Sequence, residues 1–221
     1  TKIMIYYIGD TGLSADMKCH CMNSTIEFAV SYLSKQMILG VDTETEGMDF
    51  TSKKMIMFQI GNKEHQFVID TRSQSIEFLR DILESKEIIK ILHNTKFDYK
   101  FIKKWADIEL VNVYDTFLVE RVLHCGKRDR GYGLKALVKN YLGEELDKEP
   151  RNKFVNLQGN PYTEKQIVYG AKDVEYLIDL RNLQLPETVE KKLEKLVDLE
   201  NEVVLAFSEI EYNGLELDRE K

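Results

Sequence analysis

The chain has 221 residues, of which 43% are hydrophobic and 31% are charged, and its formal net charge is −7. This composition is typical of a globular domain and excludes a disordered chain. An acidic chain is a poor candidate for a protein that coats nucleic acid by neutralising phosphates, but it suits an enzyme that holds a few nucleotides beside bound cations. No apolar run reaches membrane-spanning length, so no membrane partner is expected. An odd count of three cysteines and no signal peptide predict a reduced, cytoplasmic setting.

The order of hydrophobic patterns along the chain predicts a mixed α/β fold. In chain order the patterns predict a strand at 2–8, a helix at 24–36, strands at 37–43, 54–60 and 65–70, a helix at 76–84, a strand at 88–93, and helices at 96–105, 113–124, 133–143 and 163–183. Three strands in hairpin-like succession, followed by alternating helix and strand, indicate a mixed sheet with helices on both faces.

The last part of the chain has a different pattern. From Pro186 a long, charge-rich helix pattern with one apolar face runs to Gly214. A long helix at this position often leads to another domain. We therefore interpret residues 1–185 as one globular domain and residues 186–221 as a helical connector.

The segment VDTETEGMDF (41–50) places acidic side chains where a predicted strand ends. Residues two apart in a strand point to the same side, so Asp42 and Glu44 share a face. Hard divalent cations prefer such oxygen ligands. The alternative is an acidic surface loop, because the same D-x-E spacing recurs at 107–109 and 218–220. Two unpaired acids at the exit of an apolar strand repel each other, and a bound cation removes that cost.

The segment HNTKFDYKF places Asp98 in the first turn of a helix that follows a buried strand. Asp98 either complements the helix dipole or supplies a third carboxylate to a metal. Asn94, just before the helix, either caps it or donates an amide hydrogen bond to a substrate.

The segment YGAKD places Tyr169 and Asp173 four residues apart on a predicted helix, where they share a face. They are either a packed tyrosine beside a solvent-exposed acid, or a fourth carboxylate beside a phenol that can orient a water molecule.

In combination these motifs have a recognisable order: D-x-E on an early strand, N-x-x-F-D at a strand–helix junction and Y-x-x-x-D on a late helix. The order resembles the 3′–5′ exonucleases of the DEDD superfamily, in the subgroup whose last motif carries tyrosine. The resemblance covers residues 20–183 and implies a ribonuclease H-like fold, with a five-stranded mixed sheet flanked by helices. The tail LENEVVLAFSEIEYNGLELDRE looks like the stretch that joins the proofreading domain to the polymerase in family A DNA polymerases. LDKEPR (146–151) and YGAKDVEYL (169–177) also look like ribonuclease D and related RNA-processing exonucleases.

The resemblance implies a two-metal mechanism with Mg²⁺ or Mn²⁺ and assigns five catalytic residues. Asp42, Glu44 and Asp173 would hold the ion that generates the nucleophilic hydroxide. Asp42 would bridge to the second ion, with Asp98 in its outer shell. Tyr169 would orient the attacking water together with Glu44. The four acids are thus the expected metal ligands.

The resemblance also implies how the terminal nucleotide is held. Thr43 and Asn94 would contact it, and Met48 would act as an apolar wedge beside the last base. Glu46 and Asp49 are expected to belong only to a solvated loop.

The function predicted from these features is that of a 3′–5′ exodeoxyribonuclease, which releases nucleoside 5′-monophosphates from the 3′ end of single-stranded DNA. Residues 1–185 would be the exonuclease domain and 186–221 the connector toward a fused polymerase. The chain is expected to be a monomer in the cytoplasm of a bacterial or phage-infected cell. The alternatives are a ribonuclease D-like RNA-trimming enzyme and an inactive DNA-binding module. The presence of all four acids and the tyrosine argues against the inactive module.

Two basic clusters are candidates for contacts with backbone phosphates. Lys100, Lys103 and Lys104 are expected to form a solvated helix face rather than a phosphate track. For the stretch of Lys127, Arg128 and Arg130 the same two possibilities stay open.

Overall fold

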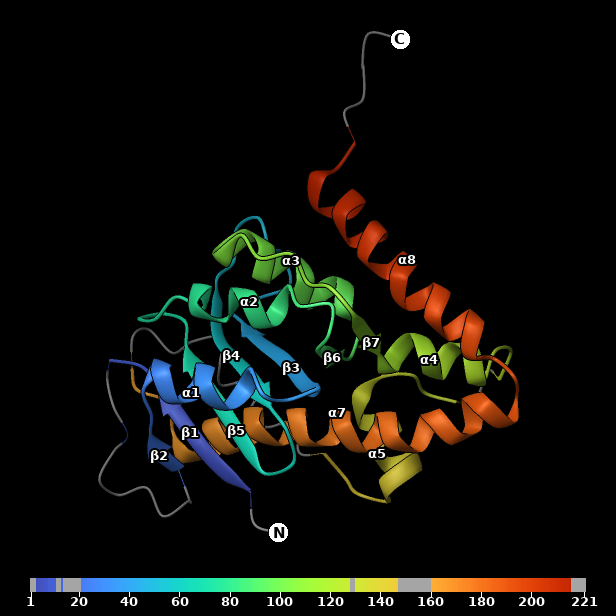
Figure 1. Ribbon diagram of the computed structural model, residues 1–221, viewed down its shortest axis with the longest axis horizontal. Coiled ribbons are helices and arrows are strands. Elements are labelled where there is room, and N and C mark those ends of the chain that lie inside the picture. Colours follow the sequence, from blue (N-terminus) through green and yellow to red (C-terminus); the bar gives the residue numbers. More distant parts are fainter. Residues whose placement is uncertain (1–2, 11–12, 14–20, 128–129, 147–159, 216–221) are drawn as a thin grey trace, which may run out of the picture.

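The computed structural model describes residues 3–10, 13, 21–127, 130–146 and 160–215. Within these residues, seven strands form one mixed sheet in the order β2-β1-β5-β4-β3-β6-β7 (Figure 1). The strands are β1 (Met4–Ile8), β2 (Cys21–Asn23), β3 (Ile38–Thr45), β4 (Met55–Gly61), β5 (His65–Asp70), β6 (Ile89–Leu92) and β7 (Val113–Asp115). β4 runs antiparallel to its neighbours β3 and β5, and the other pairings are parallel.

Helices cover both faces of this sheet. They are α1 (Ile26–Leu33), α2 (Arg80–Leu83, preceded by the 3-10 turn η1, Glu77–Leu79), α3 (Thr95–Ala106), α4 (Thr116–Leu123), α5 (Leu134–Leu142), α7 (Glu164–Glu190) and α8 (Glu194–Asn213). Figure 1 shows α1, α2 and α3 on one side of the strands and the long helix α7 along the other. The expected mixed α/β architecture with helices on both faces is therefore confirmed.

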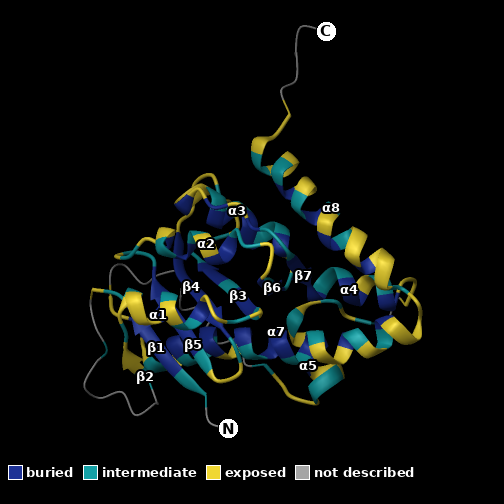
Figure 2. Cartoon of the chain, in the orientation of Figure 1, coloured by how far each residue is buried: buried dark blue, intermediate teal, exposed yellow. Residues whose placement is uncertain are grey.

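Alternating side chains of the strands build a separate core on each face. Val41 and Phe58 point toward α1, α2 and α3, whereas Met57 and Val68 pack against α7. This alternation follows from the period of two in a strand. Both faces of the central strands are consequently buried (Figure 2).

The sheet has two strands more than the expected five, namely β2 and β7. Each has three residues, which is too short for an alternating pattern to be visible in the sequence. Residues 113–115 are thus not the start of a helix, as the sequence predicted, but a buried edge strand. The helix begins only at Thr116, because the Asp115 side chain accepts hydrogen bonds from the Phe117 and Leu118 N–H groups as its N-cap.

The predicted boundary at residue 186 falls inside α7. Thr163 caps this helix in a capping box, as the sequence predicted for the cap, but the helix continues through Pro186 to Glu190. Buried polar contacts offset the cost of the proline here: the Gln184 side chain donates to the Thr116 carbonyl oxygen at 2.9 Å. The helix break instead lies at 191–193, where Lys192 has φ 56°.

The last helix, α8, packs against α3, α4 and β7 and buries Val197 and Val204. It ends as expected at Gly214, whose φ of 72° suits a residue without a side chain. No helix in the described part of the chain could cross a membrane. Cys125 is a free, exposed thiol, and the reduced, cytoplasmic setting stays a prediction.

Candidate active site

Strand β3 carries the first two acids of the site on one face. Asp42 pairs with Gln59 and Glu44 pairs with Met57 across the β3–β4 ladder. Both acids therefore point toward α7, whereas Thr43 between them points to the opposite side. The ladder has a register shift between Glu44 and Thr45, at the end of β3.

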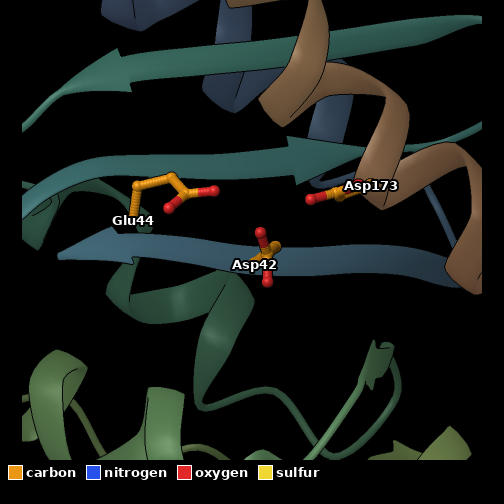
Figure 3. A group of neighbouring side chains, drawn as sticks. All are labelled: Asp42, Glu44 and Asp173. Carbon is orange, nitrogen blue, oxygen red and sulfur yellow. The ribbon is translucent and has the colours of Figure 1, made fainter. Parts of the chain in front are cut away.

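The third acid comes from α7, which lies unusually close to β3. A Cβ atom on Gly40 would lie 2.8 Å from the carbonyl oxygen of Val174, so only glycine permits this approach. The neighbouring Asp173 is thereby brought over the strand. Ligand oxygens of Asp42, Glu44 and Asp173 lie within 4.8 Å of one another. Figure 3 shows the carboxylates of Glu44 and Asp173 directed toward each other beside Asp42.

The fourth acid, Asp98, lies in the first turn of α3 and is 3% exposed. Its Oδ1 accepts a hydrogen bond of 2.6 Å from the Thr43 hydroxyl. It is not a member of the 4.8 Å group, but its charge interacts with that of Asp42. Burial and the Asp42 carboxylate raise the pKa of Asp98 well above its usual value, and the Thr43 hydrogen bond opposes this rise. Thr43 therefore links the acid on α3 to the strand that bears the other two.

One cavity of about 380 Å³ brings together every residue predicted for the site. The predicted residues along its wall are Asp42, Thr43, Glu44, Met48, Asn94, Asp98, Tyr169 and Asp173. Met48 is 75% exposed, and its role as an apolar wedge stays a prediction. Glu46 and Asp49 do not line the cavity; Asp49 instead accepts hydrogen bonds from Thr51 and Ser52 in the turn after β3. That turn position agrees with the loop role expected for both acids.

Asn94 occupies the cap position of α3 but does not cap it. It has a left-handed backbone with φ 68°, and its side chain makes no capping hydrogen bond. The prediction that Asn94 caps the helix is therefore wrong, and its contact with a substrate remains a prediction. The helix is capped by Asp115, which the sequence interpretation had placed inside a helix.

Several further residues of the cavity wall were not predicted. They are His93, Phe97, Phe117, Gly133, Leu134, Lys135 and Leu146. His93 contacts Thr116, and burial lowers the pKa of its imidazole to about 4, so it is neutral at pH 7. His93 and Phe97 belong to the HNTKFDYKF segment, although only Asn94 and Asp98 of it were assigned a role. The other residues belong to no acidic motif, so no feature of the sequence placed them in the site.

The described residues of the two basic clusters do not line this cavity. Lys100 pairs with Glu211 at 2.8 Å and Lys103 pairs with Glu209, so α3 uses these lysines to hold α8. Arg130 pairs with the buried Glu120 at 2.5 Å. Arg128 lies outside the described residues, as does nearly all of the LDKEPR segment.

The donor set of the site fits divalent cations. It offers only carboxylate oxygens from the three clustered acids, which hard ions such as Mg²⁺ prefer to nitrogen or sulfur. Glu44 and Asp173 are 6% and 5% exposed, so a cation would relieve the repulsion of partly dehydrated like charges. A carboxylate cluster between the inner strand β3 and helix α7 of a ribonuclease H-like fold is the arrangement expected of a nuclease of the DEDD class.

Comparison with known proteins identifies the family. Residues 22–188 match the model of the 3′–5′ exonuclease family, and the chain therefore belongs to that family. The DEDD-type resemblance inferred from the motifs is thereby confirmed.

The relatives come from both RNA and DNA enzymes. Ribonuclease D of Bartonella henselae is 26% identical over 187 residues, which are 84% of this chain and 44% of that protein. DNA polymerase I of Borreliella burgdorferi is 25% identical over 210 residues, 86% of this chain and 22% of the polymerase. The chain thus spans less than half of either relative.

The fold also resembles that of a solved nuclease. The structure of Brucella melitensis NrnC with bound Mg²⁺ superposes with a TM-score of 0.76 at 18% identity, and the match covers 99% of this chain and 98% of that one. At 18% identity the likeness shows the fold alone. The matched part of this chain includes α8.

Proposed function

We propose that the chain hydrolyses phosphodiester bonds at the 3′ end of a single strand and releases nucleoside 5′-monophosphates. The observation that carries this proposal is the convergence of Asp42, Glu44 and Asp173 within 4.8 Å in a cavity that also contains Tyr169. Membership of the 3′–5′ exonuclease family supports the direction of cleavage.

Asp42, Glu44 and Asp173 would hold the divalent ions, and Asp98 would contribute from the far side of β3. When bound, two such ions activate a water molecule and neutralise the charge that develops on the phosphoryl group and the leaving oxygen. The Tyr169 hydroxyl orients the attacking water from the α7 side of the cavity.

The remaining wall of the cavity suits a terminal nucleotide. Met48 presents an exposed apolar side chain against which a base can stack without regard to sequence. Asn94 offers an amide for hydrogen bonding. Lys135 is the one lysine or arginine among the described residues of the wall, and we assign it to a substrate phosphate.

We propose DNA as the substrate and proofreading for a fused polymerase as the role. The Borreliella polymerase relative and the E-x-N-G turn at the end of α8 support this assignment. Residues 1–190 would form the exonuclease part, and the connector would begin at the helix break at 191–193 rather than at 186. The expectations of a monomer and of a cytoplasmic location stay predictions.

RNA trimming is the second candidate. The match to ribonuclease D of Bartonella covers 84% of this chain at 26% identity, against 86% at 25% for the Borreliella polymerase. The segment 169–177, which looks like ribonuclease D, lies in the first half of α7.

Degradation of end-labelled single strands tests these proposals. DNA and RNA oligonucleotides of one sequence, each labelled at the 5′ or the 3′ end, are incubated with the chain in Mg²⁺, Mn²⁺ or EDTA. We expect 5′-labelled DNA to shorten stepwise, 3′-labelled DNA to release a labelled mononucleotide at once, and EDTA to stop both. Faster loss of RNA would favour the second candidate. Intact DNA and RNA in both metals would contradict the proposed activity.

A further inference from the structure

Asp115 is a buried carboxylate that no motif of the site includes. It ends β7, is 1% exposed and accepts hydrogen bonds from the backbone N–H groups of two helix starts. Its Oδ1 accepts from Asn94 at 3.0 Å, Phe117 at 2.9 Å and Leu118 at 3.3 Å, and its Oδ2 accepts from Thr95 at 2.8 Å. One side chain therefore caps the first turns of two helices, α3 and α4.

Helix α3 depends on this cap from another element. The first N–H groups of a helix have no partner within it, and the residue at the cap position normally supplies one. Asn94 does not, since its side chain makes no capping bond and its backbone is left-handed. Asp115 replaces it with charge-assisted hydrogen bonds, which are stronger than those of a neutral cap.

The register of the sheet explains why Asp115 can reach α3. β6 and β7 are parallel, and Leu92 pairs with Asp115. The carboxylate consequently lies beside the end of β6, where the chain turns into α3. On the other side of the strand, the Asp115 N–H donates to the Asn201 side chain of α8 at 2.8 Å. Asp115 is thus held in place by a helix outside the site.

The groups that Asp115 fixes belong to the cavity wall. Asn94 and Phe117, whose N–H groups it binds, both line the cavity, and Asp98 follows Thr95 by one turn of α3. A cap for α4 alone would need only the bonds to Phe117 and Leu118. The additional bonds to α3 act on the helix that bears the fourth acid.

We propose that Asp115 is a positioning residue for the nuclease site: by capping α3 and α4 together it holds Asp98 and Asn94 in register with Asp42. This inference rests on the proposed function, because it assigns Asp98 to the divalent-ion site. It predicts that the site loses metal affinity when the bonds to α3 are weakened while the fold is kept.

The test is Asp115→Asn, which keeps the size of the side chain but turns an NH₂ group toward amide donors. Mn²⁺ binding to the substrate-free chain is followed by electron paramagnetic resonance, and the rate of strand degradation is titrated with Mg²⁺. We expect about 10- to 100-fold weaker Mn²⁺ binding and a matching rise in the Mg²⁺ concentration for half-maximal rate. Circular dichroism should show the helix content of the wild type.

Thr25→Ala is the matched control, because Thr25 caps α1 with a hydrogen bond from the Phe28 N–H and does not line the cavity. It should lower the melting temperature but leave Mn²⁺ binding unchanged. Wild-type Mn²⁺ binding in Asp115→Asn would overturn the proposal, and so would an equal loss of binding in Thr25→Ala.

If Asp115→Asn does not fold, Asp115→Ser is measured in the same way, because serine can still cap α4 but is too short for the Thr95 amide. The Mn²⁺ measurement does not require hydrolysis. A wild type that cleaves no substrate but binds Mn²⁺ more tightly than Asp115→Asn would therefore contradict the proposed function and support the role of Asp115.

Discussion

Gly40 of β3 lies against Val174 of α7 with no room for a side chain between them. A Cβ atom added at Gly40 would lie 2.7 Å from Val174 Cγ1 and 2.8 Å from the Val174 carbonyl oxygen. Asp173 and Asp42 are the neighbours of this contact along the two elements, so the closeness of helix and strand sets the distance between their carboxylates.

Gly40→Ala should therefore damage activity and stability together. The carbonyl oxygen belongs to the helix backbone and cannot move aside as a side chain could, so α7 must shift. We expect a loss of about 1–3 kcal/mol in the free energy of unfolding, measured by urea denaturation, and a fall in degradation rate of about 10-fold or more from the displaced Asp173. The double variant with Val174→Ala should recover part of the stability, because one of the two clashes is gone. Wild-type activity and stability in Gly40→Ala would show that the contact does not exist.

Helix α8 should contribute to the stability of the exonuclease domain even if it also leads to another domain. Val204 of α8 is 4% exposed in the core formed with α1, α2 and α3, whereas its neighbour Val203 is only partly buried. Val204→Ala should lower the free energy of unfolding by about 2 kcal/mol, the transfer free energy of its methyl groups with a cavity term. Val203→Ala is the control, because it brings the same gain in helix propensity as Val204→Ala. It should lower the free energy of unfolding by less than half as much. Equal unfolding midpoints of the two variants would indicate that α8 is an undocked connector.

Buried Lys90 should make the stability of the protein rise with pH in the alkaline range. Burial lowers the pKa of Lys90 to about 8, against 10.5 for the exposed side chain. Between these values the unfolded chain binds a proton that the folded chain has released, so the free energy of unfolding increases from pH 8 to pH 10.5 and is constant below that window. At 1.36 kcal/mol per pKa unit the increase is about 3 kcal/mol. This figure is an upper limit, because the carbonyl oxygens of Ser85 and Ile88 accept from the ammonium group and favour its charged form.

Lys90→Met isolates this contribution from other titrating groups. The difference in unfolding free energy between wild type and Lys90→Met is measured by urea denaturation at pH values from 7.5 to 10.5. We expect the free energy of unfolding of the wild type to increase relative to that of the variant as the pH rises from 8 to 10.5. A constant difference across the range would contradict a shifted pKa at Lys90.

The sequence was most informative where function imposes fixed residue types. Asp42 and Glu44 could be placed on one strand face from their spacing alone, and the same holds for Tyr169 and Asp173 on one helix face. Their convergence could be inferred only from the resemblance to a family, because the approach of α7 to β3 depends on Gly40, which looks like any other glycine in the sequence.

Other features depend on contacts between distant segments and left no local signal. Residues 113–115 had an apolar pattern that continued into α4, and only their pairing with β6 makes them a strand. Pro186 is a helix breaker by local rules, yet α7 passes through it because tertiary contacts outweigh the local cost. Asp115 of β7 reaches the start of α3 because β7 pairs in parallel with β6, the strand that leads into α3.

The most direct test of the central claim is the degradation of a 5′-labelled single strand by wild type and Asp42→Ala in saturating Mg²⁺. Asp42 belongs to the cluster with Glu44 and Asp173, and its charge also interacts with the buried Asp98. Its loss removes much of the charge stabilisation of the transition state. We predict a ladder of products shortened from the 3′ end in the wild type, and a rate lower by about 10³-fold or more in Asp42→Ala. A near-normal rate in Asp42→Ala would contradict the assignment of this cluster as the active site.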